Sequence, residues 1–174
     1  EGVELVHTKR GRERRTFITT LREAADFVEV ALGAPDCYET VTHVDPDAPL
    51  PIDATSAGVL ADWLAFGNLH LEAVRGTLGG DDWSEVQLWP EHFDLATDLG
   101  LSDGTRANFG VSPGDDLVLD PYAYAAPWSE ARRAGFGQYA FGRVVTYPEL
   151  RAASDADGAL REFFATAATD LSKT

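Results

Sequence analysis

The chain has 174 residues, an ordinary size for one domain, and 44% of them are hydrophobic, so it can bury a core without disulfides or metals. Its 29 acidic and 14 basic residues give a net charge of −15, which argues against nucleic-acid binding because phosphate would be repelled. No apolar run reaches the length of a membrane span, and the single cysteine, Cys37, has no partner for an internal disulfide. We therefore expect one cytoplasmic domain that binds neither nucleic acid nor membrane.

The N-terminal part is predicted to be helical after a basic segment. Three interpretations stay open for the basic residues within 1–15: a mobile arm, a phosphate-binding arm, or pairing with acidic residues of the protein. Residues 16–80 form the predicted helical part. Apolar residues recur at helical spacing over 16–32, and Asp53 or Thr55 can cap a second helix with an apolar stripe from Leu60 to Val74. Residues 38–44 are a short predicted strand, and the prolines of 45–51 indicate a loop.

From Glu85 the apolar period changes to two, which predicts a sheet over residues 85–146. Phe93 and Leu95 should point to one face of the first strand, and His92 and Asp94 to the other. Later strands are predicted at 106–112, 117–119, 122–126 and 144–145.

Two turns set the expected strand pairing. A three-residue loop over 102–104, with Gly104 in the left-handed conformation, pairs Leu95 with Val111 and places Asp98 opposite Asn108. The sequence Ser-Pro-Gly-Asp at 112–115 is typical of a type II turn, so Gly114 should have a positive φ.

The C-terminal residues 147–172 are predicted to be helical again, with Pro148 in a first turn and Asp155 or Asp157 as a cap. Helices, then a meander, then helices indicate an α+β fold, an antiparallel meander sheet with the N-terminal helices and the C-terminal helix packed on one face. The apolar faces of the predicted strands and helices indicate a common core. Its strand residues are Phe93, Leu95, Phe109 and Val111, and Leu21, Val28, Trp63 or Leu64 of the helices should cover them.

The segment His92-Phe93-Asp94 is the sharpest chemical motif. On a strand, the side chains of His92 and Asp94 would face the same way, about 7 Å apart. This arrangement suits a carboxylate that orients an imidazole, two ligands of one metal, or hydrogen bonds that only support the sheet. Further metal ligands would have to come from His43, Asp45 or the other histidines, and no closed metal motif is present, so no metal ligand is assigned.

Other reactive side chains are better explained by structure. His70 follows aromatic residues on the second predicted helix and is interpreted as a buried structural histidine. Cys37 lies beside Asp36 and Glu39, which disfavour its thiolate. Aromatic residues crowd the region from Trp89 to Phe141, which is typical either of a core or of a small-molecule pocket. The candidate binding residues are His92, Asp94, Asn108, Arg106, Tyr122, Tyr124 and Trp128.

Three motifs together resemble a family of uncharacterised bacterial proteins that is frequent in actinobacteria. They read Leu-Trp-Pro-Glu-His-Phe-Asp-Leu-Ala at 88–96, Asn-Phe-Gly-Val-Ser-Pro-Gly-Asp at 108–115 and Pro-Tyr-Ala-Tyr-Ala-Ala-Pro-Trp at 121–128. The resemblance covers residues 85–128 and, more loosely, the tail to Phe164. It implies an intracellular soluble protein, and it implies no catalytic residue because the family has no known activity.

The leading hypothesis is a protein that binds a small molecule in a polar and aromatic pocket on the sheet. Whether it is an enzyme, and which cofactor it would use, the sequence leaves undetermined. Two alternatives remain. One is a non-enzymatic module that binds a protein partner, and the other is a metal-dependent enzyme that uses His92 and Asp94.

Overall fold

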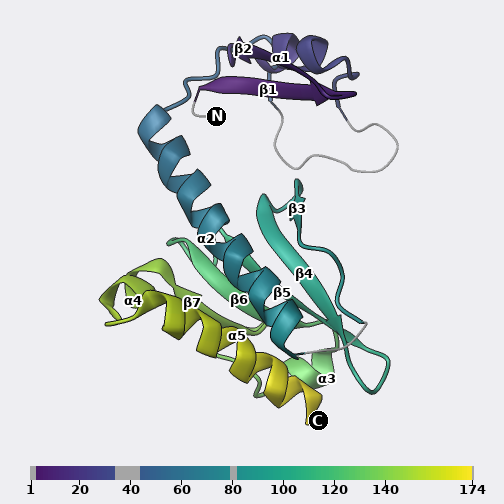
Figure 1. Ribbon diagram of the computed structural model, residues 1–174, viewed down its shortest axis with the longest axis vertical. Helices are drawn as coiled ribbons and strands as arrows, with labels where there is room; N and C mark the ends of the chain where they lie inside the picture. The colour runs from purple at the N-terminus through teal and green to yellow at the C-terminus, as the bar shows by residue number, and fades with distance from the viewer. Residues whose placement is uncertain (1–2, 34–43, 79–81, 174) are drawn as a thin grey trace. The chain divides into compact units, whose positions relative to one another are not determined.

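A computed structural model of the chain describes residues 3–33, 44–78 and 82–173 (Figure 1). The chain divides into two compact units, residues 1–60 and 61–174, and each is treated by itself below. Helices and an antiparallel sheet confirm the α+β class. The single domain stays a prediction. Cys37, His43, residues 38–43 of the expected strand and Gly79-Gly80 lie outside the described residues.

The first unit begins with a β-hairpin. Strands β1 (Glu4–Lys9) and β2 (Arg12–Phe17) pair antiparallel through a two-residue turn, Arg10-Gly11, in which both residues have positive φ, 52° and 75°. Such turns match the twist of the strands they connect. Residues 4–17 therefore form a hairpin, and the expected helix start at Thr16 is wrong.

Helix α1 (Leu21–Val28) is accordingly shorter than the predicted 16–32. The side-chain oxygen of Thr20 accepts a hydrogen bond from the backbone N–H of Glu23 at 3.1 Å, which caps the helix. Glu29 ends it in the left-handed conformation, with φ at 62°.

Three basic residues of the hairpin pair with acidic neighbours of the same unit. Lys9 and Arg14 both form ion pairs with Glu29, the second at 3.1 Å, and Arg15 pairs with Glu13 at 2.8 Å. For these three residues the structure matches the interpretation of pairing with acids.

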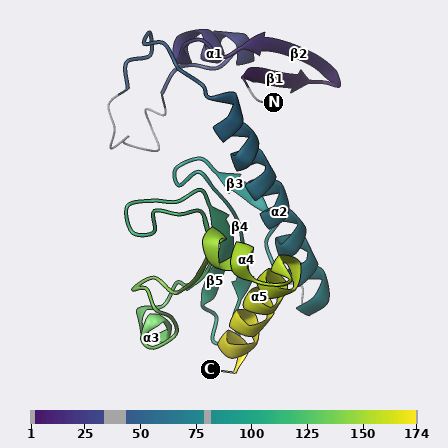
Figure 2. The same cartoon turned by 90° about the vertical axis from the view of Figure 1, so that its left-hand side faces the viewer.

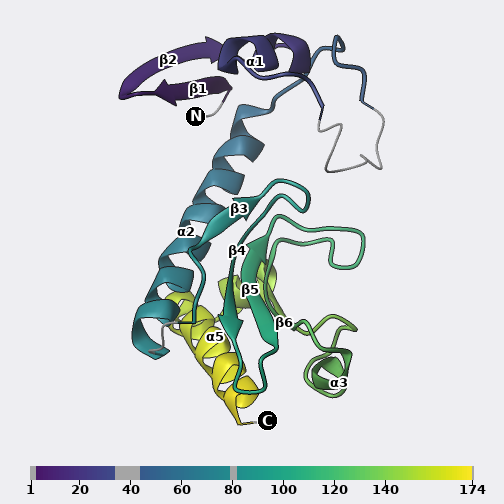
Figure 3. The ribbon, with the colours of Figure 1, turned by 90° about the vertical axis from the view of Figure 1, so that its right-hand side faces the viewer.

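The second unit contains a five-stranded antiparallel sheet whose strands follow chain order, as predicted for a meander. Figure 3 shows β3 to β6 of this sheet. Its strands are β3 (Gln87–Trp89), β4 (Asp94–Gly100), β5 (Arg106–Ser112), β6 (Tyr122–Pro127) and β7 (Arg143–Thr146). The remaining helices are α2 (Ala54–Leu78), α3 (Glu130–Arg133), α4 (Tyr147–Ala152) and α5 (Ala156–Ser172). Helix α2 starts before the boundary between the units and lies in the second unit from Ala61 onwards.

The helix starts follow the expected caps. The carboxylate of Asp53 accepts the N–H of Ser56 at 2.7 Å, and that of Asp155 accepts the N–H of Gly158 at 2.9 Å. Pro148 lies in the first turn of α4. Within the described part of the chain, no helix combines the length and the apolarity that a membrane crossing requires.

The predicted pairing of β4 with β5 is confirmed. Leu95 pairs with Val111 and Asp98 with Asn108, and the N–H of Leu101 donates to Thr105 O at 2.8 Å, which closes a three-residue loop. Gly104 has φ at 80°. A two-residue loop would have slipped the register and turned every apolar side chain to the other face.

The turn after β5 is partly as expected. Gly114 has a positive φ of 110°, as predicted, but residues 117–119 are not a strand. The carboxylate of Asp115 accepts the backbone N–H groups of Leu117 and Val118 at 2.7 and 2.9 Å, which curls the chain. Consequently Val118 is buried, while Leu117 stays exposed.

The core of the second unit lies between the sheet and the helices α2 and α5, which cover the same face (Figure 2). Phe109 and Val111 are fully buried there, Trp63 is buried, and Leu95 and Leu64 pack against the cluster. Phe93 is exposed, so its predicted place in the core is wrong. Leu21 and Val28 belong to the first unit and are not members of this core.

Helix α2 approaches the sheet closely at one small residue. A Cβ added to Gly67 would lie 2.2 Å from the side chain of Val111, so only glycine lets the helix pack at this distance. Nearby, the indole N–H of Trp63 donates to the carbonyl oxygen of Ser112 at 2.8 Å. These two contacts hold the end of β5, where the candidate site begins.

Candidate functional site

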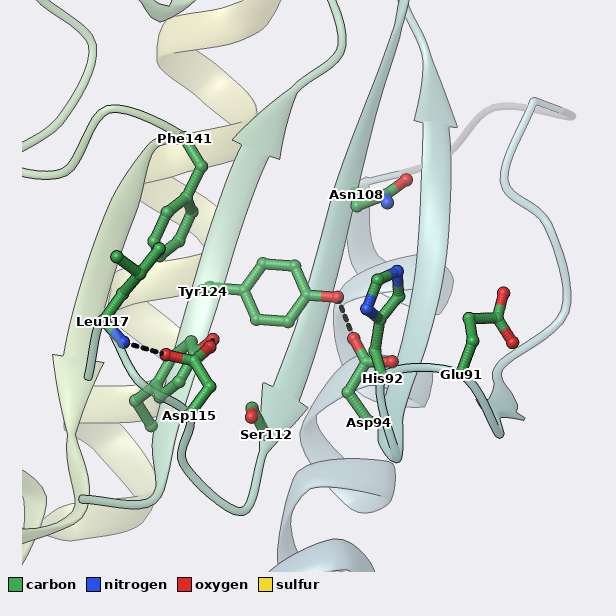
Figure 4. A pocket seen from close by; sticks show the side chains of 10 residues that line it. Glu91, His92, Asp94, Asn108, Ser112, Asp115, Leu117, Tyr124 and Phe141 are labelled. Atoms are coloured by element: carbon green, nitrogen blue, oxygen red, sulfur yellow. Dashed lines mark hydrogen bonds between the residues drawn. The ribbon is translucent and has the colours of Figure 1, made fainter. Parts of the chain in front are cut away.

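A pocket opens on the sheet face opposite the helices, within the second unit (Figure 4). Its volume of about 450 Å³ falls within the range typical of small-molecule sites. The lining combines acidic, polar and aromatic side chains from three strands and three loops. These are Glu91, His92, Asp94, Asn108, Ser112, Asp115, Leu117, Tyr122, Tyr124 and Phe141.

The turn between β3 and β4 presents His92. The N–H of His92 bonds to Trp89 O at 3.3 Å, so residues 89–92 form a β-turn with Pro90 at the position where its fixed φ is favourable. Phe93 then adopts a left-handed φ of 51°, a strained conformation for a residue with a large side chain. The predicted strand through His92, Phe93 and Asp94 is therefore wrong, since β4 begins only at Asp94.

The alternation of apolar residues does not reveal this turn, and Pro90 is the residue that signals it. Proline before a polar pair is a turn signal, and the left-handed residue reverses the alternation at Phe93. His92 and Asp94 nevertheless line the same pocket. They meet because the loop folds over the end of the sheet, not because they share one strand face.

Asp94 and Tyr124 form the buried centre of the pocket. Tyr124 lies opposite Gly110 in the pairing of β5 with β6, and its hydroxyl donates to Asp94 Oδ2 across β5 (Figure 4). A Cβ on Gly110 would lie 2.6 Å from the Tyr124 ring, so the glycine leaves the space that the ring needs. The position of the Tyr124 ring therefore explains why the Asn-Phe-Gly motif has glycine at residue 110.

One oxygen of this carboxylate lacks a partner. Asp94 is only 6% exposed, and among the described residues nothing donates a hydrogen bond to its Oδ1. Burial raises the pKa of Asp94, although the hydroxyl of Tyr124 and the imidazole of His92 both favour the charged form. Burial and the nearby Asp94 raise the pKa of Tyr124 as well, so its proton stays on the phenol.

Asp115 and Tyr122 form a second pair beside the first. The Tyr122 hydroxyl donates to Asp115 Oδ2 at 2.5 Å. Burial acts to raise the pKa of Asp115, but this hydrogen bond and those from the N–H groups of Val118 and Leu117 outweigh it, so the pKa is lowered. The carboxylate of Asp115 therefore accepts hydrogen bonds from its own loop and from Tyr122, on both of its oxygens. Asp94, in contrast, has such a bond on Oδ2 only.

Asn108 joins the pocket to Trp128. The indole N–H of Trp128 can only donate, so it is the carbonyl oxygen of Asn108 that accepts at 2.7 Å. The NH₂ group of Asn108 remains as a donor on the pocket wall. Trp128 itself does not line the pocket.

Arg106 lies apart from the pocket. Its guanidinium pairs with Asp98 and, at 2.9 Å, with Asp82. Of the seven predicted binding residues, the structure brings five to the pocket and leaves Arg106 and Trp128 outside its lining.

Sequence reasoning missed Glu91, Ser112, Asp115, Leu117 and Phe141 in the lining. Two signals were available in the motifs. Glu91 precedes His92 in the proline turn, and Asp115 follows the turn glycine, a place where a carboxylate often binds backbone N–H groups. Phe141 belongs to the aromatic-rich region that was typical of either a core or a pocket, but only the tertiary fold brings its loop to β6.

The described residues offer no group of ligands large enough for a metal site at this pocket. Across residues 3–33, 44–78 and 82–173, the His, Cys, Asp and Glu side chains form no group of three or more that could hold a metal ion. His70 is 2% exposed and its Nε2 lies 3.1 Å from Asp157 Oδ1, while its Nδ1 has no hydrogen-bond partner among the described residues. Its structural role stays a prediction.

Comparison of this chain with protein-family models, with curated proteins and with solved structures finds no match. The resemblance of the three motifs to an actinobacterial family therefore stays a prediction.

Proposed function

We propose that this protein binds a small polar molecule in the pocket around Asp94. The observation that carries the proposal is the free Oδ1 of Asp94, a carboxylate oxygen that is buried and has no donor among the described residues. A bound molecule that donates a hydrogen bond to this oxygen would remove the cost of leaving it unpaired.

The surroundings of Asp94 support a binding site over a purely structural role. Buried polar groups are normally satisfied, so an unpartnered one in a pocket lining needs an explanation. Nδ1 of His70 also lacks a partner among the described residues, but His70 does not line the pocket. The pocket also retains His92, whose side chain is exposed, and the NH₂ group of Asn108 as further polar contacts. The strained backbone of Phe93 lies between two of the lining residues, as strain often does at binding sites.

An acid–base role is compatible with the same groups. The exposed His92 and the buried Asp94 lie in different environments of the same pocket. Catalysis would be observed as turnover of a bound compound, and the proposal of binding does not depend on it. The cytoplasmic location expected from the single cysteine is kept as part of the proposal.

The proposal is tested by thermal melts and ligand-observed NMR with a panel of metabolites and divalent metals. Wild type should show a compound that raises its melting temperature. His92→Ala should lose that shift while its own stability changes by less than about 0.5 kcal/mol, since His92 is exposed. Asp116→Asn is the matched control, because Asp116 is exposed and does not line the pocket.

The opposite pattern would refute the proposal. A structural His92 would cost about 1–3 kcal/mol of stability when removed, because a buried partner would lose its hydrogen bond. Such a loss in His92→Ala, with no compound shifting wild type, leaves no reason to regard the pocket as a site.

A protein-interaction role is the second candidate. Leu117 and Leu119 are 71% and 86% exposed on the loop between β5 and β6, and exposed apolar side chains that lie together can mark a protein-binding surface. If this loop binds a partner protein, Leu119→Ser should weaken that complex and leave small-molecule binding unchanged, because Leu119 does not line the pocket.

A further inference from the structure

The charge of the pocket restricts what it can bind. The lining includes the three carboxylates of Glu91, Asp94 and Asp115, and none of the described lining residues is a lysine or arginine. An anionic ligand would be repelled by these three carboxylates, and the chain adds a net charge of −15 at longer range. A cation is attracted by the same field.

The aromatic side chains form one continuous cluster next to these carboxylates. The ring centroids of Tyr122 and Tyr124 are 6.0 Å apart, and those of Tyr122 and Phe141 are 6.3 Å apart. Tyr122 and Tyr124 are buried, and their phenolic hydroxyls point to Asp115 and Asp94. Aromatic rings attract cations and also pack against apolar groups, so this cluster suits an organic cation.

The free oxygen of Asp94 adds a requirement for a proton donor. A quaternary ammonium group has no N–H and would leave Oδ1 unpaired, and a neutral hydroxyl would donate to it without balancing its charge. A primary or secondary ammonium group supplies both the hydrogen bond and the charge.

On these grounds we propose that the ligand of this pocket is a small primary or secondary ammonium compound with an apolar body. Its N–H⁺ group bonds to Asp94 Oδ1, and its body packs against the rings of Tyr122, Tyr124 and Phe141. This inference rests on the proposed function and specifies the chemistry of the same site.

The test compares four probes of one shape on the full chain at pH 7.5: benzylamine, benzyl alcohol, benzyltrimethylammonium and benzoate. Dissociation constants are measured by ligand-observed NMR. Benzylamine should bind at least about tenfold more tightly than each of the others, the factor expected for one charge-assisted hydrogen bond.

Two variants assign the effect to Asp94. Asp94→Asn keeps the shape of the side chain and removes its charge, so benzylamine should lose the tenfold preference. Asp116→Asn makes the same change of charge at an exposed residue outside the lining and should bind benzylamine like wild type. Equal loss in both variants, or no loss in Asp94→Asn, would show attraction by the acidic surface and overturn the inference.

The outcomes separate this inference from the proposed function. If benzyl alcohol, benzoate or a metabolite without an amine binds, loses affinity in His92→Ala and exceeds benzylamine, the pocket is a binding site for another ligand class and only the ammonium inference fails. If neither these probes nor any compound of the metabolite panel binds the folded wild type, both proposals fail.

Discussion

The two faces of the five-stranded sheet differ in what covers them. The face toward α2 and α5 is closed by long helices and buries Phe109, Val111 and Phe164 completely. The opposite face is covered by loops and carries a smaller cluster around Tyr122 and Tyr124, together with a pocket of about 450 Å³. Helices fill their side with apolar atoms, whereas loops leave room for polar groups.

Both faces bury polar side chains. Thr97 on the helix side is buried, but its hydroxyl donates to Ser84 O at 2.8 Å and is therefore satisfied. Asp94 on the pocket side is buried, and its Oδ1 has no hydrogen-bond partner among the described residues; the same holds for Nδ1 of His70 on helix α2. The pocket side differs because its unpartnered group is a carboxylate oxygen in a pocket lining, where a ligand could supply the missing donor. We therefore expect the helix face mainly to stabilise the fold and the pocket face to bind.

The largest effect should come from Phe109→Ala on the helix side. Phe109 is fully buried, and its ring centroid lies 5.2 Å from that of Trp83 and 6.2 Å from that of Phe164. Loss of this ring should lower the free energy of unfolding by about 3–5 kcal/mol, as for other buried aromatics. Urea unfolding followed by tryptophan fluorescence measures it.

Leu119→Ala is the control for this comparison, since Leu119 is 86% exposed and its truncation should change stability by no more than about 0.5 kcal/mol. A loss in Phe109→Ala as small as that of the control would remove the distinction between a stabilising face and a binding face.

A smaller effect is expected from Gly110→Ala on the pocket side. The added Cβ would lie 2.6 Å from the Tyr124 ring, so the ring must move and its hydroxyl must leave Asp94. Overpacking of this kind costs about 1–3 kcal/mol. Gly76→Ala is the matched control, because nothing lies within 4 Å of a Cβ there and alanine in a helix should add about 0.5–1 kcal/mol.

Denaturant unfolding of the two glycine variants should therefore give changes of opposite sign. If Gly110→Ala is as stable as wild type and retains the ligand-induced shift, then the position of the Tyr124 ring over Gly110 is not a constraint on the pocket.

The smallest and most diagnostic effect concerns pH. Because burial raises the pKa of Asp94, the folded protein holds this proton more tightly than the unfolded chain does. The contribution of Asp94 to stability is therefore favourable at low pH and is lost as the pH rises through the raised pKa. Asp94→Asn stays neutral, so at pH 7.5 it should be more stable than wild type by about 1 kcal/mol, and the difference should shrink toward pH 4.

Thermal melts of both proteins across this pH range measure the difference, and other carboxylates cancel because both proteins contain them. An Asp94→Asn variant that is less stable than wild type at pH 7.5 would mean that the carboxylate stabilises the fold, and the pocket face would then resemble the helix face.

Local sequence signals predicted the structure correctly where a feature depends on residues close together in the chain, such as a strand register or a helix cap. The alternation of β4 and β5 and the three-residue loop at Gly104 predicted the observed register, and Asp53 and Asp155 cap the helices as expected. They failed where neighbouring signals conflict, as at Pro90 and Phe93, where a turn interrupts the alternation. The N-terminal hairpin was missed because its charged residues conceal the strand pattern.

The α+β class, the order of the sheet and five of the residues that line the pocket were predictable from the sequence, because hydrophobic period and turn chemistry act over a few residues. Three features of the pocket were not predictable in this way: Asp94 is buried with an oxygen that has no partner among the described residues, Tyr124 reaches it across Gly110, and Phe141 and Asp115 complete the lining. Burial and the close approach of loops depend on contacts between residues far apart in the chain, and no local pattern contains them.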